Sequence, residues 1–334
     1  MKALKTTGKI ILILLPVILV WIYLAVFPVN YMDGEYSYYQ EAKDYRRGKT
    51  SQEKADVLIL GDSRAKSAFL PELLDELGGS ENCVSLAQGG STSVEAYYAL
   101  KEYMENMGVP DKVVLSVSAY HFTSFDGFWT RTVYFDTITY SDAMDVIRAV
   151  KKNGEKQALK DAGGDSVFTL LEYKIQSPTK YMTPLVNSFS EDRRQINEDA
   201  YREMEEHKGF KTFVSWWPVS GEYDMTEFVM LKTLDEYYRK ILDLCNEYDI
   251  ELYSMNTPLI ETTFEECRKI WEPFMGYFKD LKNDYPEDVY PGIHIETTIE
   301  SYDEKYFDDA DHLNEEGARV YTKWFYETYL EAAS

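Results

Sequence analysis

Val57-Leu58-Ile59-Leu60-Gly61-Asp62-Ser63-Arg64 is the stretch that decides the fold, because four consecutive apolar residues end in a glycine and a serine follows two positions later. A short apolar run of this kind is typical of a buried strand in a parallel sheet. The glycine permits a sharp turn, after which a helix can begin at the serine. The stretch therefore predicts an α/β fold with the Ser63 hydroxyl at the carboxyl end of the first strand, where such sheets bind ligands.

The same alternation of strand and helix continues through the globular part, residues 56–330. Further strands are predicted at residues 83–86, 112–117, 250–255 and 293–296. Helices are predicted at residues 63–77, 94–107, 141–152 and 226–246, and a last one begins near Asn314. This order implies a parallel sheet of about five strands with helices on both faces. Residues 120–225 are less regular and are expected to form a helical and irregular insert or cap.

Composition limits the function. The chain has 334 residues, 45% of them hydrophobic, which is enough for a substantial core. Its formal net charge is −23. Nucleic acid would be repelled by this charge, so we expect no nucleic-acid partner. A neutral glycan or a small ester suits the charge better than a polyanionic polymer.

Residues 10–27 form a run of 18 residues without a charge. As a helix the run would be roughly 27 Å long, close to the thickness of a bilayer's hydrocarbon core. Three lysines and no acidic residue precede it, which predicts a cytoplasmic N-terminus (residues 1–9), a single-pass anchor in the cell membrane and an extracytoplasmic remainder. A cleaved signal peptide would need a small-x-small site, which Phe27-Pro28-Val29-Asn30 lacks. A buried core helix is the least favoured alternative for a run that is apolar all round. Residues 28–55 are then expected to be a tether with one short helix at most.

A serine hydroxyl needs a base before it can act as a nucleophile. The chain offers four histidines: His121, His207, His294 and His312. His312 is favoured because Asp309 lies three residues earlier in a turn-like segment, where its carboxylate can meet the ring nitrogen and fix the tautomer. Asp311, the immediate neighbour, is expected to point away. The sequence thus predicts a catalytic triad of Ser63, His312 and Asp309.

A glycine-rich turn, Gln88-Gly89-Gly90-Ser91, follows the second predicted strand. A glycine N–H can approach an oxyanion closely because no side chain intervenes. We therefore expect the backbone N–H groups of Ser63 and Gly90 to form an oxyanion hole, with Gly90 preferred over Gly89. The turn lacks both the P-loop lysine and the dinucleotide fingerprint, so a nucleotide site is not predicted.

These three blocks together resemble the SGNH hydrolase (GDSL-like) superfamily. The resemblance rests on Gly61-Asp62-Ser63-Arg64, on the block from Ala87 to Thr92 and on the Asp309–His312 block, and it spans roughly residues 55–330. It implies a flavodoxin-like three-layer α/β/α sandwich, a Ser-His-Asp triad and no cofactor. One departure is clear, because the family's third block normally supplies an asparagine, and the chain has Ser116-Val117-Ser118-Ala119 there. Ser118 or a nearby backbone N–H would have to substitute, and His121 is a further auxiliary candidate.

The anchor, the outward domain and the insert are similar to membrane-tethered SGNH proteins that work beside membrane-bound O-acyltransferases. This implies a serine enzyme that moves an acyl group, most simply acetyl, from an ester donor to a cell-surface glycan. A free-standing esterase that passes the group to water, and a catalytically silent assembly subunit, remain alternatives.

Two smaller features stay open. The aromatic residues of the insert could stack on a sugar or could simply pack a cap onto the sheet rim: Phe213, Trp216, Trp217 and Tyr223. The three cysteines make no disulfide framework, although a Cys245–Cys267 bridge is left open. No Cys/His spacing typical of a metal site occurs.

Overall fold

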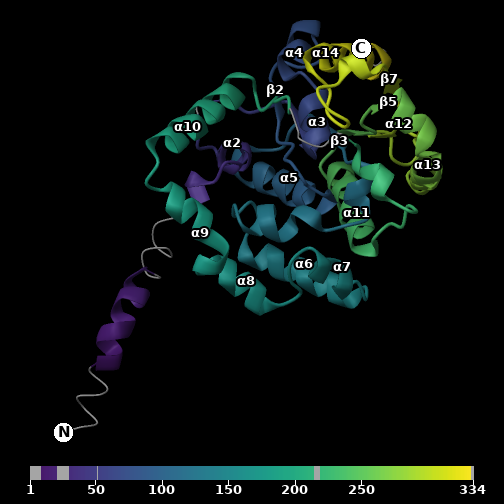
Figure 1. The fold of residues 1–334 in the computed structure, drawn as a ribbon. Coiled ribbons are helices and arrows are strands. Elements are labelled where there is room, and N and C mark those ends of the chain that lie inside the picture. Colours follow the sequence, from purple (N-terminus) through teal and green to yellow (C-terminus); the bar gives the residue numbers. More distant parts are fainter. Residues whose placement is uncertain (1–8, 21–29, 51, 214–218, 332–334) are drawn as a thin grey trace.

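A computed structural model describes residues 9–20, 30–50, 52–213 and 219–331. Its centre is a sheet of five parallel strands in the order β2-β1-β3-β4-β6 (Figure 1). The strands are β1 Val57–Gly61, β2 Cys83–Ser85, β3 Lys112–Ser116, β4 Glu251–Met255 and β6 Ile293–Ile295. The predicted α/β class and its five-strand parallel sheet are confirmed, and each strand end lies within one residue of its expected position.

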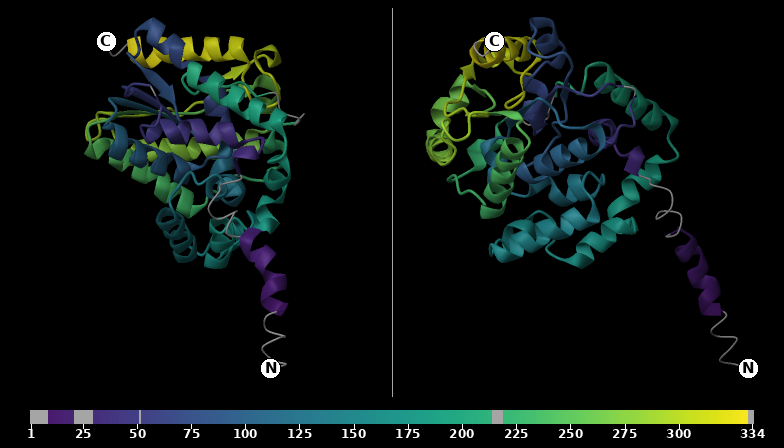
Figure 2. Two further views of the ribbon diagram at one scale, coloured as in Figure 1. Left: turned by 90° about the vertical axis from the view of Figure 1, so that its left-hand side faces the viewer. Right: turned by 180° about the vertical axis from the view of Figure 1, so that it is seen from behind.

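Both faces of the sheet are buried, as a parallel sheet requires. On β1, Leu58 and Leu60 pack into one core with α5 (Ser93–Met107) and α11 (Lys232–Glu247). Val57 and Ile59 point the other way, into a core with the C-terminal helix α14 (Glu315–Phe325). Figure 2 shows helices on both sides of the strands. The alternation along β1 therefore places the sheet between two helical layers.

The remaining elements complete the layers and the insert. A capping box formed by Thr92 and Glu95 begins α5. The insert is largely helical. The other helices and short strands are η1 Asn30–Met32, η2 Ala119–Phe122, η3 Phe128–Val133, α6 Tyr140–Lys152, α7 Lys156–Asp161, α8 Val167–Lys174, α9 Pro178–Asn187, α10 Glu191–Glu206, η4 Gly221–Asp224, β5 Leu259–Ile260, α12 Glu261–Glu266, α13 Arg268–Asp284, β7 Ser301–Tyr302, η5 Glu304–Tyr306 and η6 Tyr326–Leu330.

One predicted helix is wrong in its extent. The single helix expected over residues 63–77 is two helices, α3 (Ser63–Ala68) and α4 (Pro71–Leu77). Proline disfavours helical geometry in the residue before it, and Leu70 is indeed extended, with φ −94° and ψ 101°. The break confines the serine to a helix of six residues.

The range expected to be a tether, residues 28–55, contains a helix that belongs to the fold. This helix, α2 (Tyr36–Arg46), packs against α5 and α10. Tyr45 and Arg46 are almost completely buried. Arg46 forms a salt bridge with Glu102 of α5, so the segment is attached by charge as well as by packing.

The predicted membrane anchor, residues 10–27, lies only partly within the described residues. Residues 9–20 are helical, and residues 21–27 lie outside the described ranges. Within those ranges, no helix combines the length and the apolarity needed to cross a membrane. The anchor therefore stays a prediction.

Gly61 is a position where the fold tolerates only glycine. Its φ is +150°, and a Cβ added there would lie 1.8 Å from the backbone oxygen of Ser116 on the neighbouring strand. We expect Gly61→Ala to lower the free energy of unfolding by about 2–4 kcal/mol, measured by urea denaturation. The matched control is Gly276→Ala in α13, where a Cβ meets nothing within 4 Å and a gain of about 0.5–1 kcal/mol is expected. Equal stabilities for the Gly61 variant and the native chain would contradict the proposed close contact.

Candidate active site

Ser63 lies at the first position of α3, immediately after β1. Asp62 caps this helix, since its Oδ1 accepts the backbone N–H groups of Arg64 (3.0 Å) and Ala65 (3.3 Å). The strand, the glycine turn and the cap together hold the serine at the carboxyl edge of the sheet. This is the position that the sequence predicts for it.

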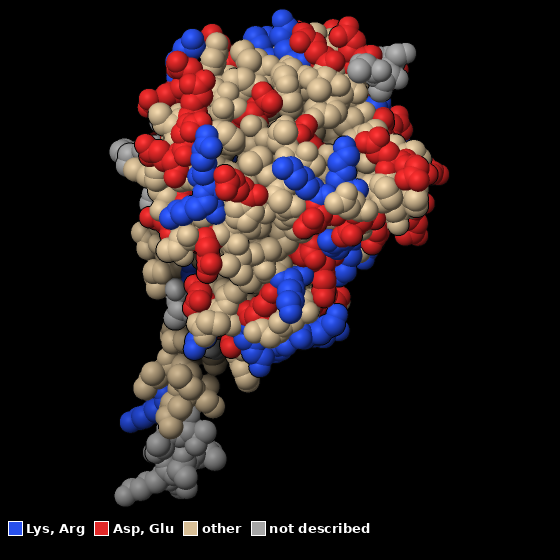
Figure 3. Space-filling view, turned by 90° about the vertical axis from the view of Figure 1, so that its right-hand side faces the viewer, with Lys and Arg blue, Asp and Glu red and all other residues tan. Residues whose placement is uncertain are grey.

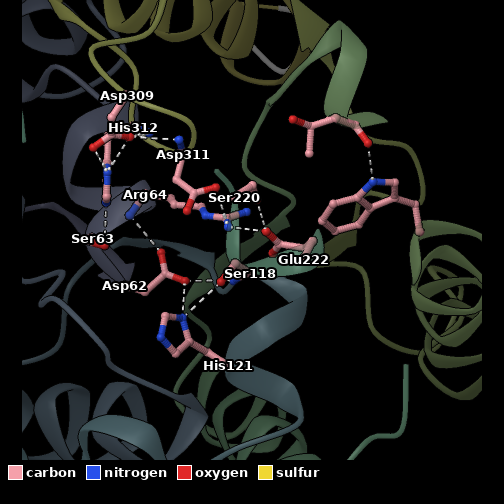
Figure 4. A network of polar contacts seen from close by, with 12 residues as sticks. Asp62, Ser63, Arg64, Ser118, His121, Ser220, Glu222, Asp309, Asp311 and His312 are labelled. Carbon is pink, nitrogen blue, oxygen red and sulfur yellow. Dashed lines mark hydrogen bonds and ion pairs between the residues drawn. The ribbon is translucent and has the colours of Figure 1, made fainter. Parts of the chain in front are cut away.

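The structure brings the three predicted triad residues together (Figure 4). The Ser63 Oγ lies 2.8 Å from the His312 Nε2. On the other side of the ring, Nδ1 lies 2.9 Å from Asp309 Oδ2 and 3.0 Å from Oδ1. A carboxylate only accepts hydrogen bonds, so Nδ1 carries the proton and donates it, which leaves the Nε2 lone pair to accept the Ser63 O–H. This is the arrangement that a serine nucleophile and its base require.

The carboxylate of Asp309 is held by its own loop. Oδ1 accepts the backbone N–H groups of Asp311 and His312, each at 2.8 Å. Burial alone would raise the pKa of Asp309, but the hydrogen bond and charge interaction with His312 and the two backbone N–H groups outweigh it. The pKa of Asp309 is therefore well below its usual range, and the group stays ionised at neutral pH.

A second histidine pairs with the residue beside the serine. The Nδ1 of His121, in η2 just after β3, lies 2.8 Å from Asp62 Oδ2 and 3.0 Å from Ser118 Oγ. The backbone N–H of Ser118 donates to the same Asp62 oxygen at 2.9 Å. Burial would raise the pKa of Asp62, but the bond to His121 and the nearby charges lower it overall. Ser118 and His121 thus hold Asp62, and the Ser118 N–H is already used there.

Arg64 connects the serine helix to the histidine loop. Its Nη2 donates to Asp311 Oδ1 at 2.8 Å and to Glu222 Oε2 at 2.5 Å. Arg64 is 7% exposed and the Glu222 side chain is fully buried, which makes the pair a buried one. Asp311 does point away from the His312 ring, as expected, and it does so toward Arg64. The network therefore ties α3, the 309–312 loop and η4 to one another.

The glycine turn lies beside the serine. A Cβ built on Gly89 would be 3.9 Å from the Ser63 Cβ, while one on Gly90 would be 2.7 Å from Nη1 of Arg131. Gly90 has a φ of +70°, which favours glycine, and the Gly89 carbonyl accepts the Tyr39 hydroxyl at 2.8 Å. The turn is thus fixed next to Ser63, with the Arg131 guanidinium against Gly90.

One of the predicted aromatic residues contacts the site. The Phe213 ring packs against the His312 ring, with centroids 5.1 Å apart, and Tyr38 packs against Phe213 at 5.8 Å. Trp216 and Trp217 lie outside the described residues. The Tyr223 hydroxyl donates to Glu266 of α12 at 2.9 Å.

The two remaining histidines have other partners. His207 lies 3.3 Å from Glu72, and His294 lies 3.3 Å from Glu251. In the part of the chain that the structure describes, no three His, Cys, Asp or Glu side chains are grouped in a way that could hold a metal ion.

No protein-family model matches this chain, and comparisons with curated proteins and with solved structures find no significant match either.

Sequence reasoning missed the partners of Asp62 and Arg64. Asp62 adjoins the serine and His121 follows a strand end on the same rim, so their pairing had a signal in the order of strands. No sequence signal pointed to Glu222 as a partner of Arg64, because Glu222 lies 158 positions away in the irregular insert.

The pKa of Asp309 leads to a prediction about stability. A carboxylate whose pKa is lowered by folding stabilises the fold fully above its unfolded pKa of about 3.9, and this contribution is lost as the pH falls toward the folded value. We expect Asp309→Asn to reduce the free energy of unfolding at pH 7, and the difference from the native chain to shrink steadily below about pH 4. Urea denaturation at a series of pH values measures this. A difference that is the same at pH 3 and pH 7 would show that the Asp309 charge has no role in stability.

Proposed function

We propose that this protein is a membrane-anchored, extracytoplasmic serine enzyme of acyl esters that transfers an acyl group, most simply acetyl, to a cell-surface glycan. The observation that carries the proposal is the chain of hydrogen bonds from Asp309 through His312 to Ser63. A hydroxyl in contact with an oriented imidazole is the usual means of making serine nucleophilic.

The proposed reaction has two halves. In the first, Ser63 Oγ attacks the ester carbonyl while His312 Nε2 takes the hydroxyl proton. The tetrahedral oxyanion then collapses, the alcohol leaves with the proton from His312, and the acyl group remains on Ser63. In the second half, His312 deprotonates the acceptor hydroxyl, which attacks the carbonyl of the acyl-serine. The second oxyanion collapses, the bond to Ser63 Oγ breaks, and Oγ takes the proton back from His312 as the acylated acceptor leaves. Asp309 stabilises the imidazolium in both halves.

The oxyanion would be stabilised by the Ser63 amide and by the glycine turn. A Cβ built on Gly89 would lie 3.9 Å from the Ser63 Cβ, whereas Gly90 is the glycine preferred from the sequence, and both belong to the same turn. The Arg131 guanidinium lies at Gly90 and is itself paired with Glu35 and Asp126. Preorganised charge near a developing oxyanion is among the largest contributions to acyl transfer. These groups support catalysis without the asparagine that the resembled family uses.

The resemblance to SGNH hydrolases gains support from topology. The strand order β2-β1-β3-β4-β6 follows the flavodoxin-like pattern once the short β5 is left out. We propose on this basis a flavodoxin-like sandwich and an SGNH-type enzyme. The anchor at residues 10–27 favours transfer beside a membrane-bound acyltransferase partner over hydrolysis by a free-standing esterase.

A fluorophosphonate probe tests the nucleophile, because such probes react with activated serines. We expect the full-length protein in detergent to be labelled on Ser63, and both Ser63→Ala and His312→Ala to lose labelling by at least about 10³-fold. The matched control is His207→Ala, which removes an exposed histidine away from the triad and should label normally. An unlabelled native protein would favour the silent assembly subunit instead.

The acceptor is tested separately with an aryl acetate as donor. We expect a neutral oligosaccharide to increase release of the aryl alcohol and to appear as an acetylated product, seen by mass spectrometry. Release that is unaffected by the oligosaccharide at every concentration, with acetate as the sole acyl product, would contradict transfer and leave the esterase.

A further inference from the structure

Exposed apolar side chains are concentrated in one part of the insert. In the described part of the chain from residue 30 onward, twelve large hydrophobic residues are exposed, and seven of them lie between residues 167 and 196. Single exposed hydrophobic residues are ordinary, but a concentration of them marks an interaction surface. We call six of them the apolar edge: Val167, Phe168, Leu171, Met182, Val186 and Phe189.

The apolar edge is formed by the outer sides of α8 and α9. Met182, Val186 and Phe189 follow one another at spacings of four and three, which places them on one side of α9 and of the turn after it. The two helices meet through their inner sides, where the rings of Tyr173 and Tyr181 are buried and in contact. Phe168 is 80% exposed and Phe189 is 88% exposed. Exposing two phenylalanine side chains to water to this extent is unfavourable in free energy unless another surface covers them.

The chain enters the fold at this same place. Asn187, the last residue of α9, donates to the carbonyl of Met32 (3.4 Å), and Asn197 of α10 donates to that of Tyr31 (2.7 Å). Three residues separate the proposed anchor, which ends at residue 27, from residue 31. Fully extended, they span about 11 Å. If residues 10–27 cross the bilayer, the end of α9 must therefore lie close to its surface.

Charge beside the apolar edge is basic on its N-terminal side. Residues 148–180 contain seven lysines and arginines and four aspartates and glutamates, whereas residues 190–206, which follow the edge, contain three and seven. Figure 3 shows basic side chains along the lower edge of the molecule, the end from which the N-terminal helix leads away. Aromatic and aliphatic side chains beside lysines and arginines are the composition of helices that lie in a membrane interface. Basic residues also favour anionic headgroups.

We propose that the apolar edge docks into the surface of the bilayer in which the chain is anchored, with Phe168 and Phe189 inserted among the lipids. This inference rests on the proposed anchor. Docking would add a second attachment to the proposed anchor, and so fix the orientation of the domain above the membrane. The occupant is lipid because the entry of the chain brings the edge to the membrane, and the segment that precedes the edge is basic.

Nitroxide labels on the full-length protein test this inference. The three native cysteines are free and buried, so labels can be directed to Phe168→Cys and Phe189→Cys. Val289→Cys is the matched control, since Val289 is 60% exposed and follows α13, a helix that lies across the molecule from α9 in Figure 1. The proteins are reconstituted into vesicles of phosphatidylcholine and phosphatidylglycerol, and accessibility to oxygen and to an aqueous nickel complex is measured by power saturation.

We expect the labels at 168 and 189 to lose most of their accessibility to nickel and to gain accessibility to oxygen, while the label at 289 stays aqueous. Vesicle-bound protein with aqueous labels at 168 and 189 would overturn the docking alone. Labels that become immobile but inaccessible to both reagents would overturn it in favour of a protein partner. Protein that does not float with the vesicles would overturn the anchor and the docking together. Fluorophosphonate labelling of Ser63 in the same samples reports separately on the proposed chemistry.

Discussion

The buried carboxylate of Asp62 is the constraint on which the site depends. It is fully buried and accepts four hydrogen bonds, from the N–H groups of Arg64, Ala65 and Ser118 and from the His121 ring. A buried carboxylate is tolerated only when its oxygens are satisfied in this way. Because these donors come from the serine helix and from the segment after β3, Asp62 joins the segment that carries Ser63 to the centre of the sheet. Asp62, the residue immediately before Ser63, thereby fixes the position of the Ser63 hydroxyl.

His312 is held in place by a second set of contacts, which begins at Arg64. Arg64 pairs with Asp311, which lies one position before His312, and with Glu222 from the insert. Removing one partner of a buried pair is strongly destabilising, because the other charge is left uncompensated. The distance from Ser63 to His312 is therefore set by the serine helix itself, through the Arg64 side chain. The insert contributes to the same network, so it has a role in positioning and is not only a cover.

Much of this could be predicted from the sequence, for identifiable physical reasons. The strands were predictable because apolar runs bounded by turns are a local signal. The proximity of Ser63, Asp309 and His312 was predictable because they lie at strand and helix ends, which the parallel topology brings to one rim. The helix over residues 63–77 was predicted too long, since the leucine spacing continues across Pro71 while the backbone does not. The Arg64–Glu222 pair was not predicted, because a long-range contact with an irregular insert leaves no periodic pattern. The Asp62–His121 pair was missed although the order of strands places both residues on one rim.

The central claim is that Ser63 becomes acylated during turnover, and mass spectrometry of the quenched reaction tests it most directly. The full-length protein is mixed with an aryl acetate, stopped in acid within the first turnovers, digested and mapped. The account predicts one added acetyl group on the peptide that contains Ser63, which disappears as the donor is consumed. An acetyl group on another residue, or product formation with no adduct at any time, would contradict it.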